Sequence, residues 1–101
     1  MKTYDIQGPN GRLLAFEIGN TFTSRRRVCA IAANIPGAKV TRAPKVFSWL
    51  RESSFCEFIV DEQLFEIEEP FGDSGRYWIG PVPPRFLDVT EKVRDVFRSA
   101  K

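Results

Sequence analysis

Short segments in which apolar and polar residues alternate recur along this chain, with turn residues between them. The first two lie at residues 3–7 and 12–18, on either side of Asn10 and Gly11. Alternation with a period of two is typical of strands that bury one face, and Asn-Gly favours the tight turn of a hairpin. The chain is therefore predicted to begin with a β-hairpin.

The same alternation predicts further strands downstream. They cover Ala38–Arg42, Phe55–Val60, Leu64–Glu69 and Arg76–Gly80. Residues 61–63 separate two of these strands and predict a second hairpin. Pro81 is expected to end the last strand because proline cannot donate a ladder hydrogen bond. Residues 46–51 fit either a short strand or a helical turn.

Two segments carry the periodicity of amphipathic helices. They lie near residues 24–34 and 89–99. Thr23 or Ser24 is the expected N-cap of the first helix, because a side-chain oxygen there can accept from a backbone N–H of the first turn. Asp88 and Glu91 have the spacing of a capping box at the start of the second helix.

The predicted element order, ββαβ(β)βββα, places the chain in the α+β class. We expect a mainly antiparallel sheet with two helices packed on one face. The 101 residues are predicted to form a single domain over residues 1–101, with 43% hydrophobic and 28% charged residues, as is typical of a globular protein.

The chain shows no sequence signal for a membrane. Its longest apolar run, residues 28–33, is far shorter than the roughly 20 residues that cross a bilayer, and the first residues lack the apolar core of a signal peptide. We therefore predict a cytoplasmic protein without a membrane partner. Cys29 and Cys56 are predicted to be buried free thiols, because cytosolic disulfides are rare and this spacing matches no metal motif.

Catalytic chemistry is poorly represented in the sequence. There is no histidine, which is the usual general base and the commonest metal ligand. The string Gly-Asp-Ser-Gly at residues 72–75 suggests a serine nucleophile, but Ser74 has no candidate base, so the string predicts a tight turn instead. We expect no catalytic residue, no metal site and no cofactor.

Charge is segregated along the chain although the net charge is only +2. Residues 1–51 carry nine Lys/Arg and two Asp/Glu, residues 52–75 carry eight Asp/Glu and no Lys/Arg, and residues 76–101 carry six basic and three acidic groups. Such blocks either neutralise one another within the fold or bind a charged partner. If they pair within the fold, the pKa values of the acidic-block carboxylates are expected to fall on folding.

Three consecutive arginines open the first predicted helix. Arg25, Arg26 and Arg27 sit at the positive end of the helix dipole, where cations are unfavourable. With Arg42 they form a candidate contact for anions or nucleic acid. The alternative is that these arginines cover the rim of the core and pair with nearby carboxylates.

The strands also predict a second sheet face that the helices leave uncovered. If Tyr77 and Ile79 face the helices, Trp78 lies on the opposite face. The candidate protein-interaction residues on that face are Leu13, Phe55, Ile59, Leu64, Arg76 and Trp78. An exposed apolar patch rimmed by charge commonly marks an interaction surface. The alternative is that residues 43–53 fold over this face.

The leading hypothesis is a small non-catalytic protein that acts through protein–protein interaction, as a homodimer or with another protein. A second hypothesis is a nucleic-acid-binding module that uses the basic N-terminal half. A third is a small-ligand-binding protein with a pocket on the sheet face. Glutamates interleaved with the aromatic residues disfavour nucleic-acid binding on the sheet itself, because they repel phosphate.

Overall fold

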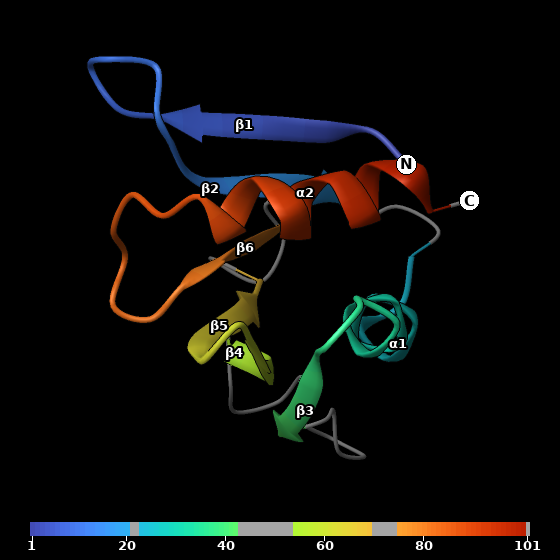
Figure 1. Ribbon diagram of the computed structural model, residues 1–101. Coiled ribbons are helices and arrows are strands. Elements are labelled where there is room, and N and C mark those ends of the chain that lie inside the picture. The colour runs from blue at the N-terminus through green and yellow to red at the C-terminus, as the bar shows by residue number, and fades with distance from the viewer. Residues whose placement is uncertain (21–22, 43–53, 70–74, 101) are drawn as a thin grey trace.

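An antiparallel six-stranded sheet with two helices is seen in the computed structural model, which confirms the predicted α+β class (Figure 1). The structure describes residues 1–20, 23–42, 54–69 and 75–100. The elements are β1 (Thr3–Gln7), β2 (Leu13–Gly19), α1 (Arg25–Ala33), β3 (Lys39–Arg42), β4 (Ser54–Val60), β5 (Gln63–Glu68), β6 (Arg76–Pro81) and α2 (Val89–Ser99). The predictions for residues 46–51, for residues 72–74 and for a cover of the second sheet face by residues 43–53 lie outside the described residues.

The strand order in the sheet is β1-β2-β6-β5-β4-β3. The last strand in sequence, β6, therefore lies between β2 and β5 and joins the two hairpins. Ile79 of β6 is in register with Phe16 on one side and with Ile67 on the other. Helix α2 packs against β1 and β2, whereas α1 packs against β3 and β4 (Figure 1).

The core lies between the sheet and the two helices. Its largest fully buried side chains are Phe16, Ile18, Val28, Ile35, Phe55, Phe58, Val60, Phe65, Ile67, Ile79, Val93 and Phe97. The strand residues among them follow the predicted alternation, apart from Phe55. Since burial of each such side chain contributes about 1.5–3 kcal/mol, this layer is the main source of stability. No helix in the described ranges is long and apolar enough to cross a membrane.

The two helices begin in different ways. Ser24 caps α1, and its hydroxyl accepts a hydrogen bond from the backbone N–H of Arg27 at 3.1 Å, as predicted. The predicted capping box of α2 is wrong, because Asp88 makes no side-chain cap hydrogen bond. Asp88 already has helical backbone angles, φ −64° and ψ −33°, which do not place its carboxylate over the first turn. The exposed carboxylate lies 3.8 Å from Arg12 instead.

The prediction of two free thiols is also wrong, because Cys29 of α1 and Cys56 of β4 form a disulfide. Their Cα atoms are 6.0 Å apart, within the usual range for a disulfide. Both residues are buried in the core. The amphipathic patterns of the helix and the strand place each cysteine inward, but only the packing of α1 on β4 brings the two sulfurs together.

The turn between β4 and β5 uses an uncommon backbone conformation. Asp61 and Glu62 have φ values of 51° and 65°, which place both in the left-handed region. Two central residues with positive φ are typical of the type I′ turn that matches the twist of a two-residue hairpin. A residue with a Cβ is disfavoured there by about 1–2 kcal/mol, and glycine is not.

Replacement of Glu62 by glycine is therefore expected to stabilise the protein. Relief of the left-handed strain is partly offset by the greater entropy of glycine in the unfolded chain, which leaves a net gain of about 0.5–1 kcal/mol in the free energy of unfolding. Urea denaturation measures the gain. The matched control is Glu62→Ala, which removes the same charge but keeps a Cβ, so an equal gain in both variants contradicts the backbone explanation.

Candidate functional site

The sheet face away from α1 and α2 is the candidate site, and we call it the distal face. The strand registers place on it Tyr4, Ile6, Ala15, Glu17, Lys39, Arg42, Ser54, Glu57, Ile59, Leu64, Glu66, Glu68, Arg76, Trp78 and Gly80. Most of these side chains are half-buried. The face therefore interleaves apolar side chains with charged groups, mainly glutamates and arginines.

Trp78 lies at the centre of this face, on β6. Its direct cross-strand neighbours are Glu17 on β2 and Glu68 on β5. The indole extends over Gly80, because a Cβ built at Gly80 lies only 2.6 Å from Cη2 of Trp78 and 2.8 Å from Cβ of Ala15. Glycine at this position therefore allows the indole to lie against the sheet, and Ala15 beneath it is fully buried.

Arg76 is held beside the indole by two kinds of contact. Its guanidinium carbon lies 3.6 Å from the centre of the Tyr4 ring, a cation–π arrangement. Its Nη1 lies 3.3 Å from Oε1 of Glu17. Tyr4 was not among the predicted site residues, although its alternation with Ile6 predicts that both lie on one face of β1.

A second polar network lies toward the β3 edge. Nε of Arg42 donates to Oε1 of Glu57 at 2.5 Å, and Nη2 of Arg42 donates to Oγ of Ser54 at 2.9 Å. The Ser54 hydroxyl in turn donates to Oε2 of Glu66 at 3.2 Å. Arg42 is therefore part of the distal face, and sequence reasoning missed this because it grouped Arg42 with the arginines of α1.

No protein-family model, characterised protein or solved structure matches this chain. Function must therefore be inferred from the side chains and their surroundings. In the described part of the chain, no group of three or more Cys, Asp or Glu residues is arranged to hold a metal ion.

The predicted protein-interaction residues divide into three groups. Ile59, Leu64, Arg76 and Trp78 lie half-buried on the distal face. Leu13 is only 4% exposed, so it adds little accessible surface. The placement of Phe55 is wrong, because this residue is 1% exposed in the core, where its ring contacts Tyr77 at 5.2 Å between centroids.

A β-bulge explains the position of Phe55. Ser54 is in register with Glu68, whereas Cys56 is in register with Ile67, so the pairing shifts by one residue between Ser54 and Cys56. The extra residue changes which side of the sheet each side chain faces. Ser54 consequently lies on the distal face, and Phe55 faces the helices.

The four arginines predicted to contact anions do not form one patch. Arg25 forms an ion pair with Glu69 at 2.8 Å, and its guanidinium carbon lies 4.7 Å from the centre of the Phe55 ring. Arg42 lies on the distal face, on the other side of the sheet from α1. Arg26 and Arg27 are exposed on α1. The alternative prediction, that these arginines pair with nearby carboxylates, is confirmed for Arg25.

The acidic block pairs with both basic blocks. Its ion pairs among the described residues are Glu57–Arg42, Asp61–Lys92 and Glu69–Arg25. Neutralisation within the fold therefore accounts for part of the charge segregation. The expectation of lowered carboxylate pKa values is wrong at Glu68, because burial and repulsion by Glu66 raise the pKa of Glu68 above its ordinary value of 4.5.

The raised pKa of Glu68 predicts a direction for the pH dependence. A carboxyl group whose pKa is higher in the folded state binds protons more strongly there, so stability falls as pH rises from about 4.5 through the folded pKa. We expect Glu68→Gln to raise the free energy of unfolding at pH 7 by about 0.5 kcal/mol, a value that allows for solvent screening. The gain should vanish below about pH 4, where the carboxyl is neutral in both states.

Urea denaturation at several pH values tests this expectation. Glu62→Gln is the control, because Glu62 is an exposed carboxylate in the β4–β5 turn. A loss of stability in Glu68→Gln at neutral pH contradicts the expected repulsion between Glu66 and Glu68.

Proposed function

We propose that this protein acts through protein–protein interaction and that it forms a homodimer through the distal face. The observation that carries the proposal is the position of Trp78, a large aromatic residue at the centre of a sheet face that also bears half-buried Ile59 and Leu64. Tryptophan at the centre of a surface surrounded by polar groups is typical of the residues that dominate binding energy in protein interfaces.

Burial of apolar surface on this face favours association. Burial of about 300 Å² of apolar surface at roughly 25 cal/mol per Å² contributes about 7 kcal/mol, which is comparable with the cost of association. Tyr4 and Ile6 of β1 extend the apolar area beyond the residues predicted from sequence. A two-fold dimer is the commonest closed arrangement, because one surface then serves both partners.

The charges restrict how two copies can meet. Glu66 and Glu68 repel their own copies if the two β5 strands lie on each other. A two-fold axis that passes through Trp78 parallel to β6 places β5 of one copy on β2 of the other. Glu68 then faces the Glu17–Arg76 pair instead of a second Glu68. Arg76 lies on the axis strand and therefore faces its own copy, and its ion pair with Glu17 and its contact with Tyr4 offset part of that repulsion.

Sedimentation velocity on the purified chain tests the proposal. We expect a dimer at about 100 µM and dissociation on dilution, as for a dissociation constant near the micromolar range. A chain that sediments as a monomer at about 100 µM contradicts the homodimer. The proposed protein–protein interaction would then involve a different protein instead of a second copy of this chain.

The cytoplasmic location stays a prediction. It was inferred from the lack of a membrane or secretion signal, and the Cys29–Cys56 disulfide weighs against it, because disulfides persist mainly in oxidising compartments. Alkylation of the protein in intact cells, before and after reduction, measures the redox state of the two cysteines and so bears directly on this location.

A further inference from the structure

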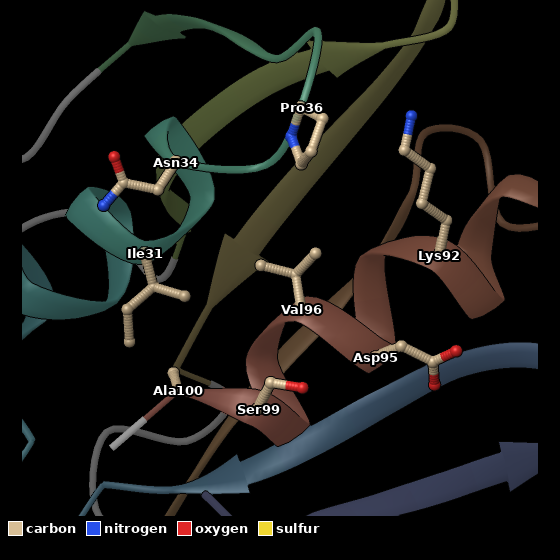
Figure 2. A pocket seen from close by; sticks show the side chains of 8 residues that line it. All are labelled: Ile31, Asn34, Pro36, Lys92, Asp95, Val96, Ser99 and Ala100. Atoms are coloured by element: carbon tan, nitrogen blue, oxygen red, sulfur yellow. The ribbon is translucent and has the colours of Figure 1, made fainter.

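A groove lies between the two helices, on the opposite side of the sheet from the distal face. Its volume is about 700 Å³, within the range of small-molecule sites. Figure 2 shows that Ile31 of α1 and Val96 of α2 project from facing helices, with Pro36 above them and Ala100 at the end of α2. The third hypothesis placed a ligand pocket on the sheet face, whereas this groove is formed by the helices.

The floor of the groove is apolar. Ile31 and Val96 pack against the core on one side. Because both are only partly buried, the rest of each side chain is accessible to solvent in the groove. Val96 lies one helical turn beyond Lys92, and Ala100 one turn further. Because the rise is 1.5 Å per residue, this stripe along α2 extends over about 12 Å. An apolar chain of similar length can therefore lie along α2 while it contacts Ile31 on α1.

Two charged residues, Lys92 and Asp95, line the groove, and they differ in their ion pairs and in the direction of their side chains. Asp95 accepts two hydrogen bonds from its neighbour Arg94, both at 3.1 Å, and Arg94 also pairs with Asp5 at 2.9 Å, so the charge of Asp95 is only partly compensated. Lys92 lies 3.6 Å from Asp61, and both side chains are substantially exposed, 40% and 59%. Such an exposed pair is weak and readily exchanged. In Figure 2 the Lys92 side chain extends on the same side of α2 as Val96, whereas the Asp95 carboxylate points away.

We propose that this groove binds a small amphipathic molecule with one carboxylate and an unbranched apolar chain. The carboxylate binds Lys92, and the chain lies over Val96 and Ile31 toward Ala100. Charge complementarity favours an anion over a cation, because the Lys92 side chain extends on the groove side of α2 whereas the Asp95 carboxylate points away from it. The proposal is independent of the homodimer, since the helices and the distal face lie on opposite sides of the sheet.

Titration of the full chain with decanoate, followed by amide NMR and calorimetry, tests the proposal, with decanol as the neutral analogue. We expect saturable shifts at the groove residues and tighter binding of decanoate than of decanol. Lys92→Met should weaken decanoate binding by about tenfold and leave decanol unchanged. Lys2→Met is the matched control, because Lys2 is an exposed lysine that does not line the groove.

A second variant separates binding from folding. Ser99 is exposed and borders the groove, so Ser99→Phe should block it without removing a core contact. We expect this variant to lose both ligands while its circular dichroism and thermal midpoint stay close to those of the wild type. Equal binding of decanol and decanoate with no effect of Lys92→Met overturns the proposal. Shifts confined to the distal face, or no saturable binding, overturn it as well.

Discussion

Reduction of the Cys29–Cys56 disulfide is expected to lower the free energy of unfolding by about 3.5 kcal/mol. The cross-link joins residues 27 positions apart, and closing a loop of that size removes many conformations from the unfolded chain. It also fixes α1 to β4. The native contacts remain when the bond is broken, so the effect should appear mainly as a lower denaturation midpoint and not as loss of the fold.

Urea denaturation of the wild type with and without reductant, followed by circular dichroism, measures this effect. The Cys29→Ala/Cys56→Ala variant is the control, because it should not respond to the reductant. Mass spectrometry after alkylation establishes which form is present in each sample. The same midpoint for oxidised and reduced wild type shows that the bond contributes nothing to stability.

Replacement of Trp78 by glutamate is expected to give a folded monomer. The substitution removes the central aromatic residue of the proposed interface and places a third carboxylate between Glu17 and Glu68, its cross-strand neighbours. We expect the dissociation constant of the dimer to rise at least about 100-fold, which corresponds to about 2.7 kcal/mol. The helix-side core should stay intact, because Trp78 is not part of it.

Sedimentation velocity and circular dichroism on matched variants test this result. Trp78→Phe keeps an aromatic ring and should remain dimeric at about 100 µM. Gln7→Glu adds the same charge at an exposed position of β1 and should also remain dimeric. A Trp78→Glu variant that is folded and still dimeric would falsify the assignment of the distal face, even if the protein is a dimer.

The fold class followed from sequence because its determinants are local. Alternation, turn residues and helical periodicity each act over a few neighbouring residues, so the strands and helices were predicted close to their observed bounds. The predictions that failed, the Asp88 cap and the two free thiols, depend on backbone conformation or on tertiary packing, which no local sequence pattern reveals. Asp88 has the residue type of an N-cap, yet its backbone is helical. Cys29 and Cys56 pair only because α1 packs on β4.

The candidate site was predicted less completely than the fold. Trp78, Ile59 and Leu64 were placed on the correct face because regular alternation holds in β5, in β6 and in β4 from Cys56 onward. Phe55 was not, since a bulge shifts its register and strict alternation cannot anticipate the extra residue. The contact between Arg76 and Tyr4 spans β1, β2 and β6, so it depends on strand order, which the sequence does not specify.

The position of β6 has a consequence for how the chain acquires its structure. Phe16 is in register with Ile79, and among the strands that the structure describes only β6 joins the N-terminal hairpin to β5. During synthesis the first hairpin leaves the ribosome well before β6, so the inner edges of β2 and β5 both stay unpaired until residue 81 has emerged. Such edges invite aggregation, and pairings of this sequence separation form slowly. The sheet therefore closes after translation of β6, and a nascent chain that stalls before residue 76 presents two separate open edges to chaperones.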